Sequence, residues 1–324
     1  MEFAKPRIVI SKCLEFDACR YNGASINDKI VRSLKKHVQF IPVCPEVEIG
    51  LGTPRDPIRL VKKDDEIRLV QPSTKIDVTT KMNKFSMNYL SNLKQVDGFI
   101  FKNRSPSCGL RGIKVYAGLE KSPVSFTDKG IFAKAVLKQF PNTPTEEEGR
   151  LTNREIREHF LTAVYALAKF RREMDRPSKR KLIEFHSANK YLFMMYNQTI
   201  MKKMGKLLAS LSDRELKETI TLYYEMLKKL FSRKPSRRSV INVHMHAMGF
   251  FSKDLNTKEK SHFLRMLEKL RNQLIPISAV NSILESWLAR YEQPYLSKQT
   301  FFQPFPQQLI MLIDSGKGRI RNQK

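Results

Sequence analysis

Short apolar runs alternate with helix-like patterns along residues 1–140. Brief runs of β-branched and aromatic residues predict strands, and apolar positions that repeat every three or four residues predict helices. Strands are expected at 7–10, 40–43 and 98–101, a hairpin at 58–61 and 66–70, and helices at 26–37, 79–93 and 131–140. Because strands that alternate with helices are typical of a parallel sheet, we expect an α/β N-terminal domain with a mainly parallel sheet.

A different pattern begins near residue 151, where apolar residues recur at helical spacing almost without interruption to about residue 293. The segment Asn256-Thr-Lys-Glu259 has the pattern of a capping box. Residues 141–149 contain two prolines, an acidic run and a glycine, which predicts a linker. Helices are expected at 153–174, 180–211, 213–231, 236–251, 257–273 and 276–291. The α/β domain is therefore predicted to be followed by an all-α helical C-terminal domain.

Composition narrows the class of protein. The 324 residues are 41% hydrophobic, which suits two folded domains and excludes a disordered chain. Lys and Arg number 59 against 32 Asp and Glu, a net charge of +27 that divides into +9 for residues 1–150 and +18 for residues 151–324. Such a chain is expected to bind a polyanion, usually nucleic acid. Without a long apolar run or a signal-peptide pattern, a cytoplasmic location and no membrane partner are expected.

All four cysteines lie within the first 108 residues, and Cys13, Cys44 and Cys108 each follow a predicted strand. Because ligands of open parallel sheets bind beyond the carboxyl ends of the strands, these thiols are expected to meet at one edge. Three thiolates with a vacant fourth position suit zinc with an open site or a [4Fe–4S] cluster with one iron free of protein ligands. Cys19 is a candidate fourth ligand, and plain burial is the alternative for the whole set.

The segments around the cysteines resemble the thiouracil desulfidase family in three motifs of matching order and spacing. The first joins Ser11-Lys-Cys-Leu14 to Cys19-Arg-Tyr-Asn-Gly23, and the second joins Cys44-Pro-Glu-Val47 to Gly50-Leu-Gly-Thr-Pro-Arg55. The third is Lys102-Asn-Arg-Ser-Pro-Ser-Cys-Gly109. The resemblance spans roughly residues 5–140. The chain departs from the family pattern at Asn22, where Asp is usual, and at Cys19, where valine is common.

The segment from about residue 150 to residue 313 resembles a helical domain that occurs alone in YbgA-type proteins. The matching segments lie at 183–191, 242–251 and 294–302. The fused arrangement is similar to the tRNA 4-thiouridine desulfidases, in which the first domain removes sulfur and the second is held to engage RNA. The resemblance implies a desulfidase-like domain at 1–142 and an RNA-binding helical domain at 150–313. The residues that follow, 314–324, are predicted from their composition to form a basic tail.

Carried over by position, the resemblance implies that Cys13, Cys44 and Cys108 hold a [4Fe–4S] cluster with one open iron, with zinc as the alternative metal. It further implies that Glu46 is the general base for a water that replaces sulfur with oxygen without net redox change. Ser105 would be a proton donor or an orienting hydroxyl, and the role of Ser107 is left open. Taken alone, Glu46 would be interpreted as a helix cap and Ser105 as a turn residue.

Basic clusters near helix ends are the candidates for RNA contacts in the second half, because such clusters neutralise phosphates. Tyr191, Tyr196 and Phe231 lie near these clusters and could stack on bases, with a core position as the alternative. His244 and His246 are expected to pack rather than to bind metal. The predicted RNA-binding residues are Arg171, Arg172, Lys179, Arg180, Lys181, Arg237 and Arg238.

Three candidate functions follow from the resemblance together with the charge and the cysteines. The first is an iron–sulfur desulfidase that acts on 4-thiouridine in tRNA, favoured by the charge of the helical half. The second is a desulfidase of free thiouracil-type bases. The third is a nucleic-acid-binding protein with a structural three- or four-thiolate metal site, which would need neither Glu46 nor Ser105.

Overall fold

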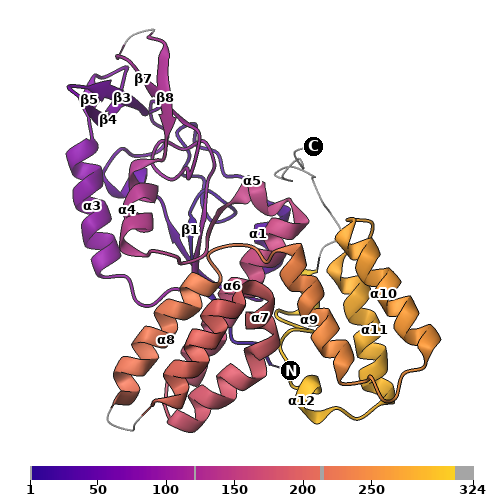
Figure 1. Ribbon diagram of the computed structural model, residues 1–324. Helices are drawn as coiled ribbons and strands as arrows, with labels where there is room; N and C mark the ends of the chain where they lie inside the picture. Colours follow the sequence, from indigo (N-terminus) through magenta and orange to yellow (C-terminus); the bar gives the residue numbers. More distant parts are fainter. Residues whose placement is uncertain (1, 120–121, 212–214, 311–324) are drawn as a thin grey trace. The chain divides into compact units, whose positions relative to one another are not determined.

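The computed structural model describes residues 2–119, 122–211 and 215–310, which form two compact units (Figure 1). Among the described residues, the first unit runs to Ala168 and includes residues 308–310, and the second spans Lys169–Gln307. The division falls within α6 (Arg154–Glu173). The predicted fold class, an α/β region with a mainly parallel sheet followed by helices, is confirmed. The predicted basic tail at 314–324 lies outside the described residues.

A four-stranded sheet carries the predicted parallel strands, in the order β2-β1-β6-β9. Its strands are β1 (Arg7–Ser11), β2 (Gln39–Val43), β6 (Gly98–Phe101) and β9 (Thr145–Glu147), all paired in parallel. Side chains of β1 and β6 are almost wholly buried, which explains why these strands are continuous apolar runs rather than alternating ones. All four strands therefore direct their carboxyl ends to the same edge.

A second, mixed sheet contains the predicted hairpin, which is confirmed as β3 (Arg59–Lys63) and β4 (Glu66–Gln71). Three short strands that the sequence did not predict complete it in the order β5-β4-β3-β7-β8. These are β5 (Ile76–Asp77), β7 (Ile113–Tyr116) and β8 (Val124–Asp128). Within this second sheet, β3 and β7 pair in parallel and the other described pairs are antiparallel.

Five helices in the described part of the chain belong wholly to the first unit. They are α1 (Lys29–Leu34), α2 (Pro45–Glu48), α3 (Thr79–Ser91), α4 (Ile131–Gln139) and α5 (Glu148–Leu151). Helices α3 and α4 share a buried cluster with both sheets, in which Met82, Phe99 and Phe132 are fully buried. The first part of α6 lies against β6, where a Cβ on Gly98 would come within 2.7 Å of Val164 Cγ1.

The linker prediction for residues 141–149 is wrong. Thr145–Glu147 form β9, which pairs with β6 from Phe99↔Thr145 to Phe101↔Glu147, and α5 begins directly afterwards. An acidic composition is typical of exposed chain, but Glu147 and Glu148 are only 4% and 6% exposed because the neighbouring loop supplies partners for both carboxylates. Pairing with β6 therefore outweighs the preference of this acidic segment for exposed, irregular structure.

The second unit is helical, as predicted. Among the described residues, its helices after α6 are α7 (Lys179–Ala209), α8 (Leu216–Leu230), α9 (Arg237–Gly249), α10 (Thr257–Arg271), α11 (Ile277–Arg290) and α12 (Pro294–Ser297). The 3₁₀ turn η2 (Gln307–Leu309) begins at the last residue of this unit. Tyr223 is fully buried between Phe170 and Phe185, and the capping box from Asn256 to Glu259 is confirmed. Among the described residues, no helix is both long and apolar enough to cross a membrane.

Candidate functional site

The parallel sheet brings the cysteine-bearing segments to one edge. Strands β2, β1 and β6 are neighbours, and Cys13 follows β1 by two residues while Cys44 follows β2 directly. Lys12 N donates to Val43 O at 2.9 Å, which extends the β1–β2 pairing up to these two cysteines. Cys108 lies in the loop after β6, where Cys108 N donates to Ser105 Oγ at 3.1 Å. The positions of the three cysteines at this edge agree with the sequence prediction.

The four thiols influence one another. Interaction with the Cys13 thiol, together with burial, raises the pKa of Cys19 to about 11, and contact with Cys19 is the chief cause of a raised pKa at Cys44. Cys44 Sγ lies 3.8 Å from the Cys19 carbonyl oxygen. Burial raises the pKa of Cys108 to about 12, with smaller contributions from Glu46 and Cys44. Thiolates are the form that binds metals, so loading of a metal group here would displace protons.

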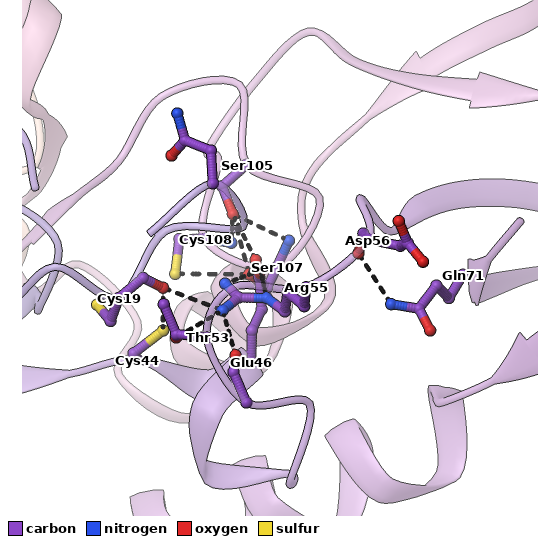
Figure 2. A network of polar contacts seen from close by, with 12 residues as sticks. Cys19, Cys44, Glu46, Thr53, Arg55, Asp56, Gln71, Ser105, Ser107 and Cys108 are labelled. Atoms are coloured by element: carbon purple, nitrogen blue, oxygen red, sulfur yellow. Dashed lines mark hydrogen bonds and ion pairs between the residues drawn. The ribbon is translucent and has the colours of Figure 1, made fainter. Parts of the chain in front are cut away.

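Glu46 points into this cluster and is held by an arginine rather than acting as a helix cap. Its Oε2 accepts Arg55 Nη2 at 2.5 Å and Arg55 Nε at 3.1 Å. The Glu46 and Arg55 side chains are 13% and 4% exposed, so this ion pair is largely buried. Figure 2 shows the pair between the Cys44 end of β2 and the loop that carries Ser105 and Cys108. The structure therefore places Glu46 beside Cys44 and Cys108.

Two hydroxyls face the other oxygen of Glu46. Ser107 Oγ donates to Glu46 Oε1 at 2.5 Å, whereas Ser105 Oγ lies at 3.3 Å from the same atom. The two hydroxyls are 2.9 Å apart, so they can form a chain from Ser105 through Ser107 to the carboxylate. Ser107 is fully buried, whereas Ser105 is partly exposed.

Ser107 is thus a site residue that sequence reasoning did not assign. Both serines stand in the same Ser105-Pro-Ser107 turn, and the chain alone does not reveal which hydroxyl reaches Glu46, a residue 61 positions away from Ser107. The sequence signal that could have identified Ser107 was its position directly before Cys108.

The loop between β6 and β7 is held by the two buried carboxylates at β9. Glu147 Oε1 accepts Leu110 N at 2.8 Å, and Glu148 Oε2 accepts Asn103 N at 2.8 Å. Glu148 Oε1 also pairs with Lys102 Nζ at 2.5 Å. Both ends of the segment that carries Ser105, Ser107 and Cys108 are therefore fixed by charge-assisted hydrogen bonds, which are stronger than neutral ones.

The donor set consists of soft ligands of the kind that iron–sulfur clusters use. Within the described ranges, no three side chains of His, Cys, Asp or Glu are arranged to hold one metal ion. A cluster differs because its cysteine ligands bind separate iron atoms, so the sulfurs need not converge on one point. Four free thiols at one sheet edge, with Cys19 and Cys108 buried, are the soft ligands that such a cluster uses.

The predicted RNA-binding residues lie at helix ends of the second unit. Arg171 and Arg172 are in the last turn of α6, and the others occupy the first turns of α7 and α9, neither of which contains an acidic residue. Among them, Arg180 pairs with Glu184 at 2.9 Å, and Lys181 Nζ donates to the Arg176 carbonyl at 2.8 Å. The exposed members are Arg172, Lys179, Arg180, Lys181, Arg237 and Arg238.

The aromatic candidates for base stacking are core residues instead. Tyr191, Tyr196 and Phe231 are 7%, 9% and 3% exposed, and the rings of Tyr196 and Phe231 pack edge-to-face at 4.6 Å. His244 is fully buried, with its ring nitrogens bonded to the Val240 carbonyl and to Asn281 Oδ1 at 2.8 Å each, which agrees with the predicted packing role.

Comparisons with known proteins match the N-terminal and C-terminal parts of the chain to different families. A family model described as 2-thiouracil desulfurase matches residues 8–148, and a second, described as a protein of unknown function (DUF1722), matches residues 190–306. The uncharacterized protein YbbK of Bacillus subtilis (strain 168) is 32% identical over 140 residues, which cover 41% of this chain and 89% of YbbK.

The uncharacterized protein YbgA of Escherichia coli (strain K12) is 25% identical over 158 residues, which cover 48% of this chain and 93% of YbgA. A solved structure of the [4Fe-4S]-dependent thiouracil desulfidase TudS is similar to 45% of this chain and 93% of its own, with 25% identity and a TM-score of 0.35.

Proposed function

Because the chain belongs to the 2-thiouracil desulfurase family through residues 8–148, we propose that it is an iron–sulfur-dependent desulfidase that acts on 4-thiouridine in tRNA. The overall reaction converts a thiocarbonyl and water into a carbonyl and hydrogen sulfide, with no net oxidation or reduction. The observation that carries the proposal is the position of Glu46, whose carboxylate faces two hydroxyls beside a group of free thiols.

Cys13, Cys44 and Cys108 would hold a [4Fe–4S] cluster. This group would supply an open, thiophilic iron that polarises the carbon–sulfur bond of the substrate. Cys19, where the family commonly has valine, is left outside the ligand set. A structural zinc site is the alternative cofactor.

The protein's own residues would move the protons. Glu46 Oε1 would accept a proton from the attacking water, since general bases of this kind must lie within hydrogen-bond reach of the group they deprotonate. Ser105 would donate a proton to the departing sulfur, because its hydroxyl is partly exposed while Ser107 is buried. Ser107 would connect the two by its hydrogen bonds to Ser105 Oγ and Glu46 Oε1.

Binding of tRNA is proposed for the helical region, with functional extents of 1–142 for the desulfidase-like domain and 150–313 for the RNA-binding domain. The charge of residues 151–324, +18, supports a polyanion as partner. Basic residues stand in the first turns of α7 and α9, where the helix dipole disfavours positive charge. An anion bound at these turns would relieve that repulsion, as a phosphate backbone would do.

The direct test is anaerobic incubation of the reconstituted protein with thiolated tRNA, followed by nucleoside analysis. We expect 4-thiouridine to be converted to uridine with release of one sulfide per base. Loss of turnover in Glu46→Gln with unchanged iron content would support the base, and Cys19→Ser should keep both iron and activity. Unaltered 4-thiouridine in the presence of a full cluster would contradict the proposal.

Two further experiments distinguish tRNA from free thiolated bases as the substrate and test the contact with RNA. Free 2-thiouracil under the same conditions tests the desulfidase of free bases, and turnover of it without turnover of tRNA would reject the RNA substrate. Binding of unmodified tRNA should weaken steeply with salt if phosphates dominate the contact, and a flat salt response would reject the role of the basic residues.

A further inference from the structure

We propose that Arg55 is a positioning residue of this site: it fixes the orientation of Glu46 and, through the same guanidinium, the loop that places Cys19 among the thiols. The proposal rests on the proposed function for its catalytic consequence. Its structural part, the control of the thiol-bearing loop, can be measured without turnover.

The contacts of Arg55 with Glu46 are asymmetric. Nε and Nη2 both donate to the single oxygen Oε2, at 3.1 and 2.5 Å. The other oxygen, Oε1, is thereby left to Ser107 and Ser105, at 2.5 and 3.3 Å. Because one oxygen is occupied by two donors of a rigid guanidinium, rotation of the carboxylate would break two bonds at once. Arg55 therefore holds the carboxylate of Glu46 in the orientation in which one oxygen faces the guanidinium and the other faces the two hydroxyls.

The third nitrogen of Arg55 reaches a different part of the site. Nη1 donates to the carbonyl oxygens of Cys19 and Gly52 at 3.0 and 2.8 Å. The Arg55 backbone N also donates to Tyr21 O at 2.8 Å. The loop after β1 is therefore tied to Arg55 at two carbonyls, and this loop carries the Cys19 thiol that contacts Cys13 and Cys44.

These contacts argue against a role for Arg55 in binding phosphate or base. All three of its side-chain nitrogens are engaged within the protein, and the side chain is 4% exposed. Figure 2 shows the guanidinium enclosed between Cys19, Thr53, Glu46 and Ser107. A residue so placed acts on the reaction through Glu46 and through the loop.

The kinetic test is a double-mutant cycle between Arg55→Ala and Glu46→Gln in the cluster-loaded full chain, with iron and sulfide content measured for each variant. Arg55→Ala should lower kcat about 100-fold, the range that a general base contributes, with little change in KM. In the Glu46→Gln background it should have almost no further effect on kcat. Methylguanidinium should restore part of the Arg55→Ala activity but none in the double variant. A raised KM or additive effects would overturn the proposal.

The structural test uses the cluster-free chain and measures alkylation of Cys19 and Cys44 by peptide mass spectrometry. Arg55→Ala should accelerate alkylation about tenfold through increased local opening, whereas Arg55→Lys should have a smaller effect. Arg68→Ala removes an exposed arginine that pairs with Glu66 in the second sheet and should leave the rate unchanged. Equal rates in the wild type and Arg55→Ala would overturn the proposal even if the chain showed no desulfidase activity, and a change in rate without any turnover would reject only the proposed function.

Discussion

Replacement of Glu148 by alanine tests whether the carboxylate at the start of α5, directly after β9, holds the loop that carries Cys108. Glu148 Oε1 lies 2.5 Å from Lys102 Nζ, and Oε2 accepts Asn103 N at 2.8 Å. The Glu148 side chain is 7% exposed and that of Lys102 is 21% exposed. Glu148→Ala therefore leaves an ammonium group and a backbone amide without their carboxylate partner in a mostly buried place.

The expected cost follows from this burial. Removal of one partner from a fully buried ion pair costs about 3–5 kcal/mol, and a lost hydrogen bond to a charged group costs about 1.5–3 kcal/mol. The partial exposure of Lys102 lets water replace some of the lost interaction, so we expect about 2–4 kcal/mol for the loop. The matched control is Glu66→Ala, which breaks an exposed pair with Arg68 and should cost about 0–1 kcal/mol.

Hydrogen exchange measured by mass spectrometry on peptides from residues 98–112 reads the local opening of this loop. A loss of 2–4 kcal/mol corresponds to roughly 30- to 700-fold faster exchange, since each 1.4 kcal/mol is a factor of ten. The Glu148→Ala chain should also take up less iron during reconstitution, because Cys108 lies in the loosened segment. Identical exchange in this loop for wild type, Glu148→Ala and Glu66→Ala would refute the reasoning.

Two further predictions concern other positions. A Cβ at Gly130 would come within 2.4 Å of the Ser107 carbonyl oxygen, so Gly130→Ala should destabilise the first unit by about 1–3 kcal/mol and lower iron loading. Gly118→Ala, whose nearest neighbour would be 3.6 Å away, is its control, and equal melting temperatures for the two variants would count against the clash. Burial lowers the pKa of His186 to about 4, whereas the unfolded chain protonates this side chain near 6.5. The contribution of His186 to the free energy of unfolding is complete above pH 6.5. It is lost as the pH falls to 4, and the loss amounts to roughly 3 kcal/mol at most. Urea unfolding followed by Trp287 fluorescence should therefore show a weaker loss of stability at acid pH for His186→Gln, and parallel pH profiles would contradict this.

Most of the elements of the fold could be predicted from local pattern. The buried strands β1 and β6 read as apolar runs because both of their faces are covered, and helices such as α7 and α10 read from their periodicity and caps. The position of Cys13 and Cys44 after predicted parallel strands was sufficient to predict that they lie at one edge of the sheet.

Strand β9 could not be predicted in this way, because its residues have no strand pattern of their own. Thr145-Glu-Glu147 joins the sheet only since β6 offers an unpaired edge and the loop after β6 offers an amide to each carboxylate of Glu147 and Glu148. Similarly, the local sequence of Tyr196 and Phe231 allowed stacking on RNA, and only helix packing shows that these rings are buried against each other.

The amino-acid sequence by itself determined the two-part organisation, the family motifs and the set of residues that carry the chemistry, since these depend on residue type and on spacing along the chain. The tertiary structure decided which of those residues meet. That Arg55 holds one oxygen of Glu46 and that Ser107 approaches the other depends on segments 9 and 61 residues apart in sequence from Glu46. Hydrogen bonds of this kind require distances of about 3 Å and aligned donors, and only the folded backbone sets those distances.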